Sequence, residues 1–365
     1  MKAAPATGRR SPATTARQVA LGRTISAVAL WLTLRGRDPG AIWRAMLEAD
    51  YRYLGPYVGV LLVIHLVRTV RWGILLEPVA KVPFLRLNAV SAVGFAALVL
   101  LPFRLGELAR PVLIADRPRL RVSAALSSVV VERVADGLFT GILLILTLLA
   151  VPPGTAGLGM ARAAGLAMSL AFAGLLAFLL LAYRNRALAV RLTSRVLGPI
   201  SARLAGKVSG MMDAFIHGLR LVPSRRKVVA FFLLTAFYWA INGWGMQLLA
   251  RAFQLDLGLL DAYTVLGVLI VGVMIPAGPG MVGTFQGAVV LGLALFVTPE
   301  AAAARGPAYA NVLWAVQMGV QLLLGLAFLP SSHVKVARLF HGVEETGEAL
   351  QAEEADYQAG GDGAR

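Results

Sequence analysis

Six long apolar segments dominate the sequence and restrict the folds that are open to it. A helix needs roughly 20 mostly apolar residues to cross the hydrocarbon core of a bilayer. Of the 365 residues, 58% are hydrophobic and only 15% are charged. This is a larger apolar fraction than the core of a soluble protein needs. The sequence therefore predicts an all-α polytopic membrane protein. Its expected spans are residues 18–34, 54–76, 123–150, 161–183, 228–250 and 308–329.

Two further apolar stretches, residues 87–101 and 262–275, are shorter and end at Pro102 and Pro276. Proline breaks a helix because it lacks an N–H group and clashes with the preceding turn. We expect each stretch to be one arm of a re-entrant hairpin that enters and leaves the membrane on the same side. Glycines follow both breaks: Gly106 after the first, and Gly278, Gly280 and Gly283 after the second.

The distribution of basic residues favours these hairpins. If both stretches are hairpins, 27 of the 35 Lys and Arg fall on one side of the membrane and seven on the other. If residues 87–101 cross fully, the division is 22 to 12. Basic residues concentrate on the cytoplasmic side of membrane proteins, so the hairpin topology is preferred, with both termini cytoplasmic. The net charge of +16 then fits contact with anionic headgroups better than nucleic-acid binding.

This topology also predicts an inverted repeat. Residues 18–150 and 161–329 each comprise a span, an amphipathic segment, a span, a broken hairpin and a span, starting from opposite sides. Such repeats are typical of transporters, whose two halves can rock around a central site. We expect three regions: a basic cytoplasmic tail at 1–17, a transmembrane domain at 18–330 and a cytoplasmic tail at 331–365 whose end is disordered.

Charged residues occur next to or inside the apolar runs of the first half. A charge at membrane depth costs at least about 2.5–3.5 kcal/mol, so these side chains should line a cavity or pair with one another. A phosphate-binding pocket and a set of structural salt bridges both satisfy this condition. The stretch LLPFRLGELARP at 100–111 contributes Arg104, Glu107 and Arg110, and the start of the following span contributes Glu132, Arg133 and Asp136.

Positions 132 and 136 share a helix face because they are four residues apart, whereas Arg133 points about 100° away. We therefore expect Arg133 to be the partner of Glu132 and Asp136, with the hairpin residues completing the pocket.

The second break, IPAGPGMVGTFQG at 275–287, is rich in residues that interrupt a helix, including Pro279 and Gly280. Backbone groups freed by such a break must be buried in protein or line a wet cavity. One interpretation is a tight turn between helices at the membrane surface. The other is a re-entrant tip whose N–H groups and following helix N-terminus face an anionic ligand.

Three motifs follow one another along the chain: P-x-R-x-G-E-x-x-R (Pro102, Arg104, Gly106, Glu107, Arg110), E-R-x-x-D (Glu132, Arg133, Asp136) and P-G-x-x-G (Pro279, Gly280, Gly283). In this order they resemble the motifs of the flippase-like family typified by the transmembrane region of lysylphosphatidylglycerol synthases. The resemblance covers about residues 50–330 and implies translocation of a lipid across the cytoplasmic membrane of a bacterium or archaeon. The family often carries a carboxylate where this chain has Gln286, which argues against proton coupling at that position.

The leading hypothesis is a lipid flippase whose arginines hold a phosphate headgroup, since a guanidinium binds phosphate bidentately and stays charged. The lipid would be anionic or modified: aminoacylated, glycosylated or polyprenyl-linked. The alternative is an integral-membrane transferase acting on a lipid carrier with Glu107, Glu132 or Asp136 as base, although no D-x-D motif is present. A scaffold for another enzyme is a third possibility.

No cofactor or metal is expected, because the chain has no cysteine and its four histidines are widely spaced. Expected partners are the bilayer, the lipid substrate, and either a second copy of the chain or a lipid-modifying enzyme. Several amides within the spans could line a cavity or bond between helices: Asn242, Gln247, Asn311, Gln317 and Gln321.

Overall fold

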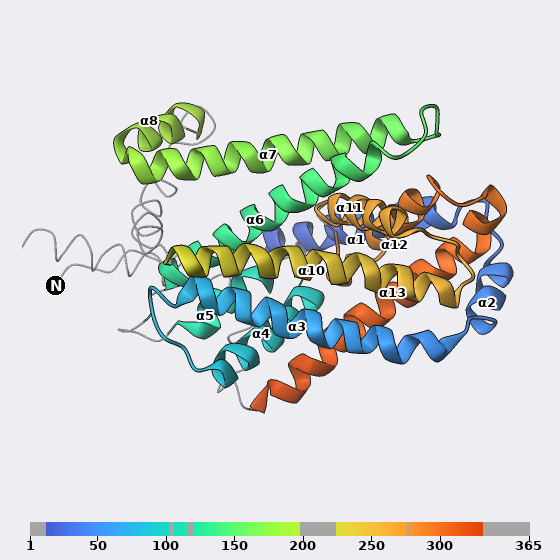
Figure 1. Ribbon diagram of the computed structural model, residues 1–365, viewed down its shortest axis with the longest axis horizontal. Helices are drawn as coiled ribbons and strands as arrows, with labels where there is room; N and C mark the ends of the chain where they lie inside the picture. The colour runs from blue at the N-terminus through green and yellow to red at the C-terminus, as the bar shows by residue number, and fades with distance from the viewer. Residues whose placement is uncertain are drawn as a thin grey trace, which may run out of the picture.

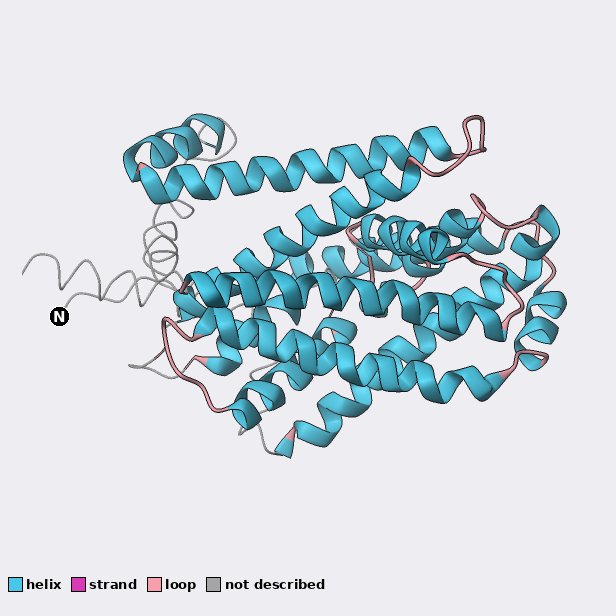
Figure 2. Cartoon of the chain, in the orientation of Figure 1, coloured by secondary structure: helices cyan, strands magenta, loops and turns pink. Residues whose placement is uncertain are grey.

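The computed structural model describes residues 12–101, 106–115, 120, 122–197, 224–275 and 277–330. Within these ranges the secondary structure is helical, with no strand (Figure 2). The predicted all-α class is therefore confirmed. The tail after residue 330 and most of the predicted N-terminal tail lie outside the described residues.

Four described helices are long and apolar enough to cross a membrane, and each coincides with a predicted span. The predicted final span started at residue 308, but the helix begins earlier, because Thr298 caps it and Pro299 occupies its first turn. The four helices are α3 (Leu54–Leu76), α7 (Leu158–Arg184), α10 (Arg225–Ala252) and α13 (Pro299–Phe328).

The other two predicted spans are also helices, but they differ from the first four. Helix α1 (Pro12–Leu34) starts before residue 18, and its apolar part is limited to Ala20–Leu34. Helix α6 (Val122–Leu148) has the length of a span, yet it contains the charged residues 132, 133 and 136. Those charges need partners inside the protein if α6 lies in the bilayer.

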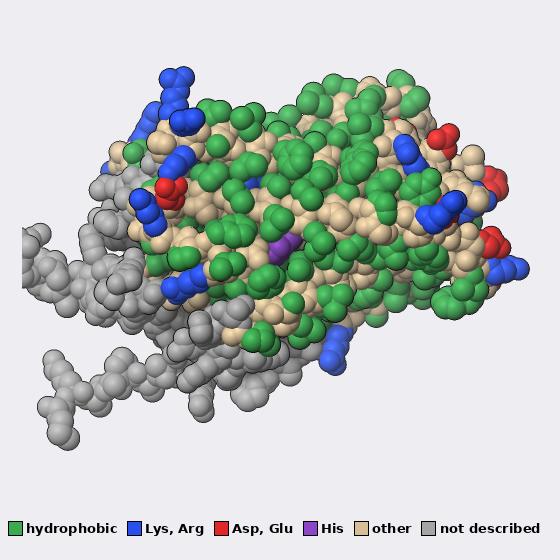
Figure 3. All heavy atoms as spheres, turned by 60° about the horizontal axis from the view of Figure 1, so that its bottom comes forward, with side chains coloured by type: hydrophobic (Ala, Val, Ile, Leu, Met, Phe, Trp, Pro, Cys, Tyr) green, Lys and Arg blue, Asp and Glu red, His purple; other side chains and the backbone are tan. Residues whose placement is uncertain are grey.

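The surface separates into an apolar middle and charged ends. Figure 3 shows hydrophobic side chains across the middle of one face, with most Lys, Arg, Asp and Glu towards its two ends. One end, here called the basic end, contains the end of α7 and the start of α10 (Figure 1) and exposes Arg184, Arg225 and Arg226. The arrangement fits a bilayer around the middle of the molecule.

Two helical hairpins lie between the long helices. The first consists of α4 (Phe84–Leu100) and α5 (Ala109–Ile114), which pack together. Gly106 lies so close to the backbone of α4 at Ala97 and Leu98 that a Cβ atom there would collide with it. Glycine is thus required where the chain turns back.

The second hairpin consists of α11 (Leu259–Val273), the short 3₁₀ helix η3 (Pro279–Met281) and α12 (Thr284–Leu293). Both first arms, α4 and α11, end just before the predicted proline breaks. Pro102 and Pro276 themselves lie outside the described residues.

Each hairpin packs on a long helix from the other half of the chain. Helix α4 packs against α13, α11 packs against α6, and α3 packs against α10. Small residues allow the close approach: a Cβ atom on Gly325 would collide with Ala96, and one on Gly267 would press on Leu144. Contacts between the halves therefore add to those within each half in building the core.

Short helices occupy the ends of the molecule. Helix α2 (Pro39–Leu47) lies at the end opposite the basic end, and α8 (Arg186–Leu197) follows α7 at the basic end (Figure 1). The predicted amphipathic segment 187–222 begins with α8, and its remainder from residue 198 lies outside the described residues.

Candidate functional site

A buried ion pair joins the first hairpin to α6. Arg110 Nη2 on α5 lies 2.8 Å from Glu132 Oε2, and neither side chain is more than 3% exposed. Gly94 on α4 makes room for this arginine, because a Cβ atom at residue 94 would collide with the Arg110 side chain. The expected pairing between hairpin and long helix is confirmed for these two residues.

A second buried pair comes from a residue that the sequence analysis did not single out. Arg71 Nη2 on α3 lies 2.5 Å from Asp136 Oδ1, and the Arg71 side chain is fully buried. Trp239 Nε1 on α10 also donates to Asp136, at 3.3 Å. The arginine was overlooked because the positive-inside rule already explained a basic residue near the end of that span.

Arg133 pairs with both of its acidic neighbours, as expected from the sequence, but its contacts are not the shortest ones that they make. Its guanidinium folds back to lie 3.3 Å from Glu132 and 3.4 Å from Asp136, and it remains 27% exposed. Arg110 and Arg71 make the shorter contacts. The half-buried Glu107 is also close enough to interact electrostatically with Arg133. Arg133 thus bridges two pairs that other helices complete.

Arg68, one turn before Arg71 on α3, is placed differently from the other arginines. Among the described residues no carboxylate pairs with it, and its Nε has no hydrogen-bond partner. Its guanidinium lies over the Phe95 ring, 3.4 Å from the centroid. Arg110, Arg133 and Glu132 are all within electrostatic range. Four arginines therefore face three carboxylates in the described part of this charge cluster.

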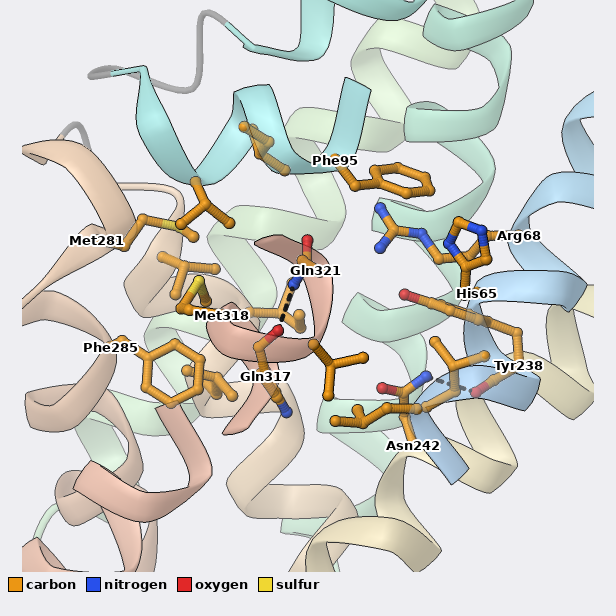
Figure 4. A pocket seen from close by; sticks show the side chains of 18 of the residues that line it. His65, Arg68, Phe95, Tyr238, Asn242, Met281, Phe285, Gln317, Met318 and Gln321 are labelled. Carbon is orange, nitrogen blue, oxygen red and sulfur yellow. Dashed lines mark hydrogen bonds between the residues drawn. The ribbon is translucent and has the colours of Figure 1, made fainter. Parts of the chain in front are cut away.

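Arg68 points into a central cavity of about 150 Å³ (Figure 4). The walls come from α3, α4, α10, α11, α12, α13 and the segment that joins α11 to α12. Both hairpins therefore contribute to one cavity, α4 through Phe95 and the second hairpin through Met281 and Phe285 (Figure 4). Its polar lining consists of His65, Arg68, Tyr238, Asn242, Gln317 and Gln321.

Three of the five amides proposed from the sequence line this cavity: Asn242, Gln317 and Gln321. Gln317 also donates to the hydroxyl of Tyr57 at 2.8 Å, so it bonds between helices as well. Gln247 instead donates to the backbone of Leu257. His65, which was not predicted as a site residue, also lines the cavity, and its Nε2 lies 3.0 Å from Asn88 Oδ1 of α4.

The turn of the second hairpin is held by neutral contacts. Gly278 donates its N–H to Ser26 Oγ of α1 at 3.0 Å, and Gly283 donates to its helix-capping neighbour Gln286 at 2.7 Å. Trp314 donates to the Gly280 carbonyl at 2.7 Å. Two of the N–H groups that the anion-binding interpretation required are therefore already occupied. Gly278, Gly280, Gly283 and Gln286 also lie outside the lining of the central cavity.

The predicted pocket residues thus gather in one place as far as they are described. Glu107, Arg110, Glu132, Arg133 and Asp136 belong to the charge cluster, and Arg104 lies outside the described residues. Within the described ranges, no group of three or more His, Asp or Glu residues could hold a metal ion.

Apolar helices around a buried charge cluster and a partly polar cavity define a multi-pass membrane protein. The chain belongs to the family described as the lysylphosphatidylglycerol synthase TM region, whose sequence profile matches residues 19–330. The resemblance noted from the sequence motifs is thereby confirmed, and with it a membrane function related to lipids. Comparison with curated proteins yields no significant match.

Proposed function

We propose that the protein is a flippase-like transporter that moves an anionic or modified lipid across the cytoplasmic membrane, with the lipid phosphate bound in the central cavity. The observation that carries the proposal is Arg68, a cation beside the cavity with no carboxylate partner among the described residues. Arg68 is half-buried at the wall of this cavity, where a cation attracts an anion, and a guanidinium matches the geometry of a phosphate.

The proposed architecture has six spans and two re-entrant hairpins arranged as an inverted repeat. The inverted repeat is supported by equivalent packing in the two halves. The first arm of each hairpin packs on the last span of the other half: α4 packs on α13, and α11 packs on α6. The hairpins start from opposite ends of the molecule, the first near the basic end (Figure 1). We place the basic end in the cytoplasm because basic residues concentrate there.

Lipid translocation can be measured in proteoliposomes of phosphatidylcholine with a trace of acyl-labelled fluorescent phosphatidylglycerol. Quenching of the outer leaflet by dithionite reports lipid that has crossed. We expect Arg68→Ala to abolish translocation and Arg68→Lys to retain part of it, because lysine keeps the charge but not the planar fork. Since Arg68 pairs with no described carboxylate, its removal leaves no orphaned acid and the fold should persist.

The matched control is Arg251→Ala, which removes an exposed arginine outside the cavity lining. This variant should translocate lipid at the unchanged rate. Unchanged translocation by folded Arg68→Ala protein would contradict the proposed phosphate site. Accumulation of a modified lipid by the protein in detergent would instead indicate a transferase. Against that alternative, Glu132 and Asp136 are already engaged in ion pairs with Arg110 and Arg71.

The proposed topology has a separate test, since single cysteines can be placed in this cysteine-free chain. Thr155→Cys, in the loop between α6 and α7, and Arg225→Cys, at the basic end, should react with an impermeant thiol reagent from opposite faces. Labelling of both from the same face would overturn the proposed orientation of α7.

A further inference from the structure

An apolar groove of about 510 Å³ lies apart from the central cavity, between the end of α7 and the start of α10. Its floor is α6 from Ala124 to Ile142, and the end of α3 closes one side at Leu75. On α7 it is lined from Leu176 to Tyr183, so its walls occupy the part of the molecule nearest the basic end (Figure 1).

The groove opens beside basic residues. Tyr183 lines it and is followed by the exposed Arg184. Val228 lines the opposite wall, and the residues just before it include the exposed Arg225 and Arg226. The apolar walls thus lead to a positively charged rim. Such a rim complements an anionic headgroup at the membrane surface.

The groove also adjoins the charge cluster. Phe231 lines the groove and lies over the guanidinium of Arg71, 5.1 Å from the ring centroid. Val134 and Ala135 line it as well, directly between the charged positions 133 and 136 of α6. At Phe231, one aromatic ring therefore lies between the apolar groove and the buried Arg71.

We propose that this lateral groove binds one acyl chain of an anionic phospholipid whose phosphate rests on the basic rim. Burial of an alkyl chain between apolar walls is favourable for every methylene group. The occupant is the substrate lipid as it enters from the leaflet at the basic end. This inference rests on the proposed function for the identity of the lipid, but it concerns a different site from Arg68.

The probe is phosphatidylglycerol with a diazirine in one acyl chain, compared with phosphatidylcholine that carries the same chain, each in proteoliposomes. After irradiation, labelled residues are mapped by peptide mass spectrometry. We expect phosphatidylglycerol to label the groove segments of α6, α7 and α10 more strongly than phosphatidylcholine does. Ala135→Trp should fill the groove and reduce this labelling to background.

The matched control is Ala173→Trp, an exposed position on α7 outside the groove lining. This variant should be labelled in the groove like the unmodified protein. Labelling spread evenly over the lipid-facing surface, or undiminished groove labelling in Ala135→Trp, would overturn the proposal.

The Arg68→Ala variant separates the two proposals. Groove labelling should survive in it even though translocation is lost. If Arg68→Ala abolishes translocation but the unmodified protein shows no groove labelling, the groove proposal alone is overturned. Groove labelling together with normal translocation by Arg68→Ala would overturn the phosphate site alone.

Discussion

The described parts of the two hairpins are held to the rest of the protein by opposite chemical means. The first is tied to the rest of the molecule by charge, through the pair between Arg110 and Glu132. The second is uncharged at its turn and is held by Ser26, Gln286 and Trp314, which bond its backbone directly. The second hairpin shows that such a turn can be held without charge. In the first hairpin, the ion pair to Glu132 both joins the hairpin to α6 and places charge inside the protein.

The largest expected effect comes from removing charge at the first hairpin. Glu132→Gln should lower the free energy of unfolding by about 3–5 kcal/mol, because Arg110 and Arg133 lose a buried compensating charge. Thermal unfolding in detergent measures the change. The control is Glu300→Gln at the exposed start of α13, where loss of an acid from the first helical turn should cost at most about 1 kcal/mol. Equal stability of both variants would show that the ion pair does not hold the first hairpin.

The next effect concerns the backbone of the second hairpin. Gly283 has a φ of +85°, and a Cβ atom there would collide with Ser26 O of α1. Gly283→Ala should therefore destabilise by about 2–4 kcal/mol, combining left-handed strain with overpacking. Gly36→Ala is the matched control. Gly36 has a φ of +73°, but a Cβ atom there would meet nothing within 4 Å. Only the backbone strain of about 1–2 kcal/mol is therefore expected. Equal destabilisation of the two variants in thermal unfolding would remove the role of the α1 contact.

A smaller loss is expected when the cap of α12 is removed. Gln286→Leu leaves the buried N–H of Gly283 without its acceptor, which should cost about 1–3 kcal/mol. Amide hydrogen exchange of residue 283 should accelerate relative to the middle of α12. Unchanged exchange would mean that another group can accept this hydrogen bond.

The smallest predicted effect is that of Trp314→Phe, which keeps an aromatic ring but removes the donor to the Gly280 carbonyl. One hydrogen bond contributes about 0.5–1.5 kcal/mol, so the unfolding midpoint should fall only slightly. Translocation in proteoliposomes should remain, since neither residue lines the central cavity. A loss as large as that of Glu132→Gln would mean that the second hairpin depends on a single contact.

Local patterns were sufficient to predict the helices and part of the site. Apolar runs located the spans, and charges embedded in such runs had to find partners, which led to Arg110 and Glu132. Arg68 and Arg71 were missed because the positive-inside rule already accounts for basic residues near the cytoplasmic end of a span. Their spacing of three residues on one helix face, adjacent to apolar neighbours, was the available signal.

Other features depend on contacts that no local pattern specifies. Asp136 receives Arg71 from α3 and Trp239 from α10, residues 65 and 103 positions away. The start of α13 was misplaced because Glu300, Arg305 and Pro307 resemble a loop, although Thr298 caps the helix and the helix continues through the proline. Tertiary packing, rather than local preference, fixes these positions.

The packing of α4 on α13 has a consequence for synthesis of the protein in the cell. Helix α4 leaves the ribosome about 200 residues before its partner, which at roughly 5–20 residues per second is a delay of about 10–40 s. During that interval α5 of the first hairpin can pack on α6, but α4 is not yet covered by α13. Biogenesis therefore passes through a half-assembled state, in which lipid or an insertion chaperone must shield α4 until the final helix arrives.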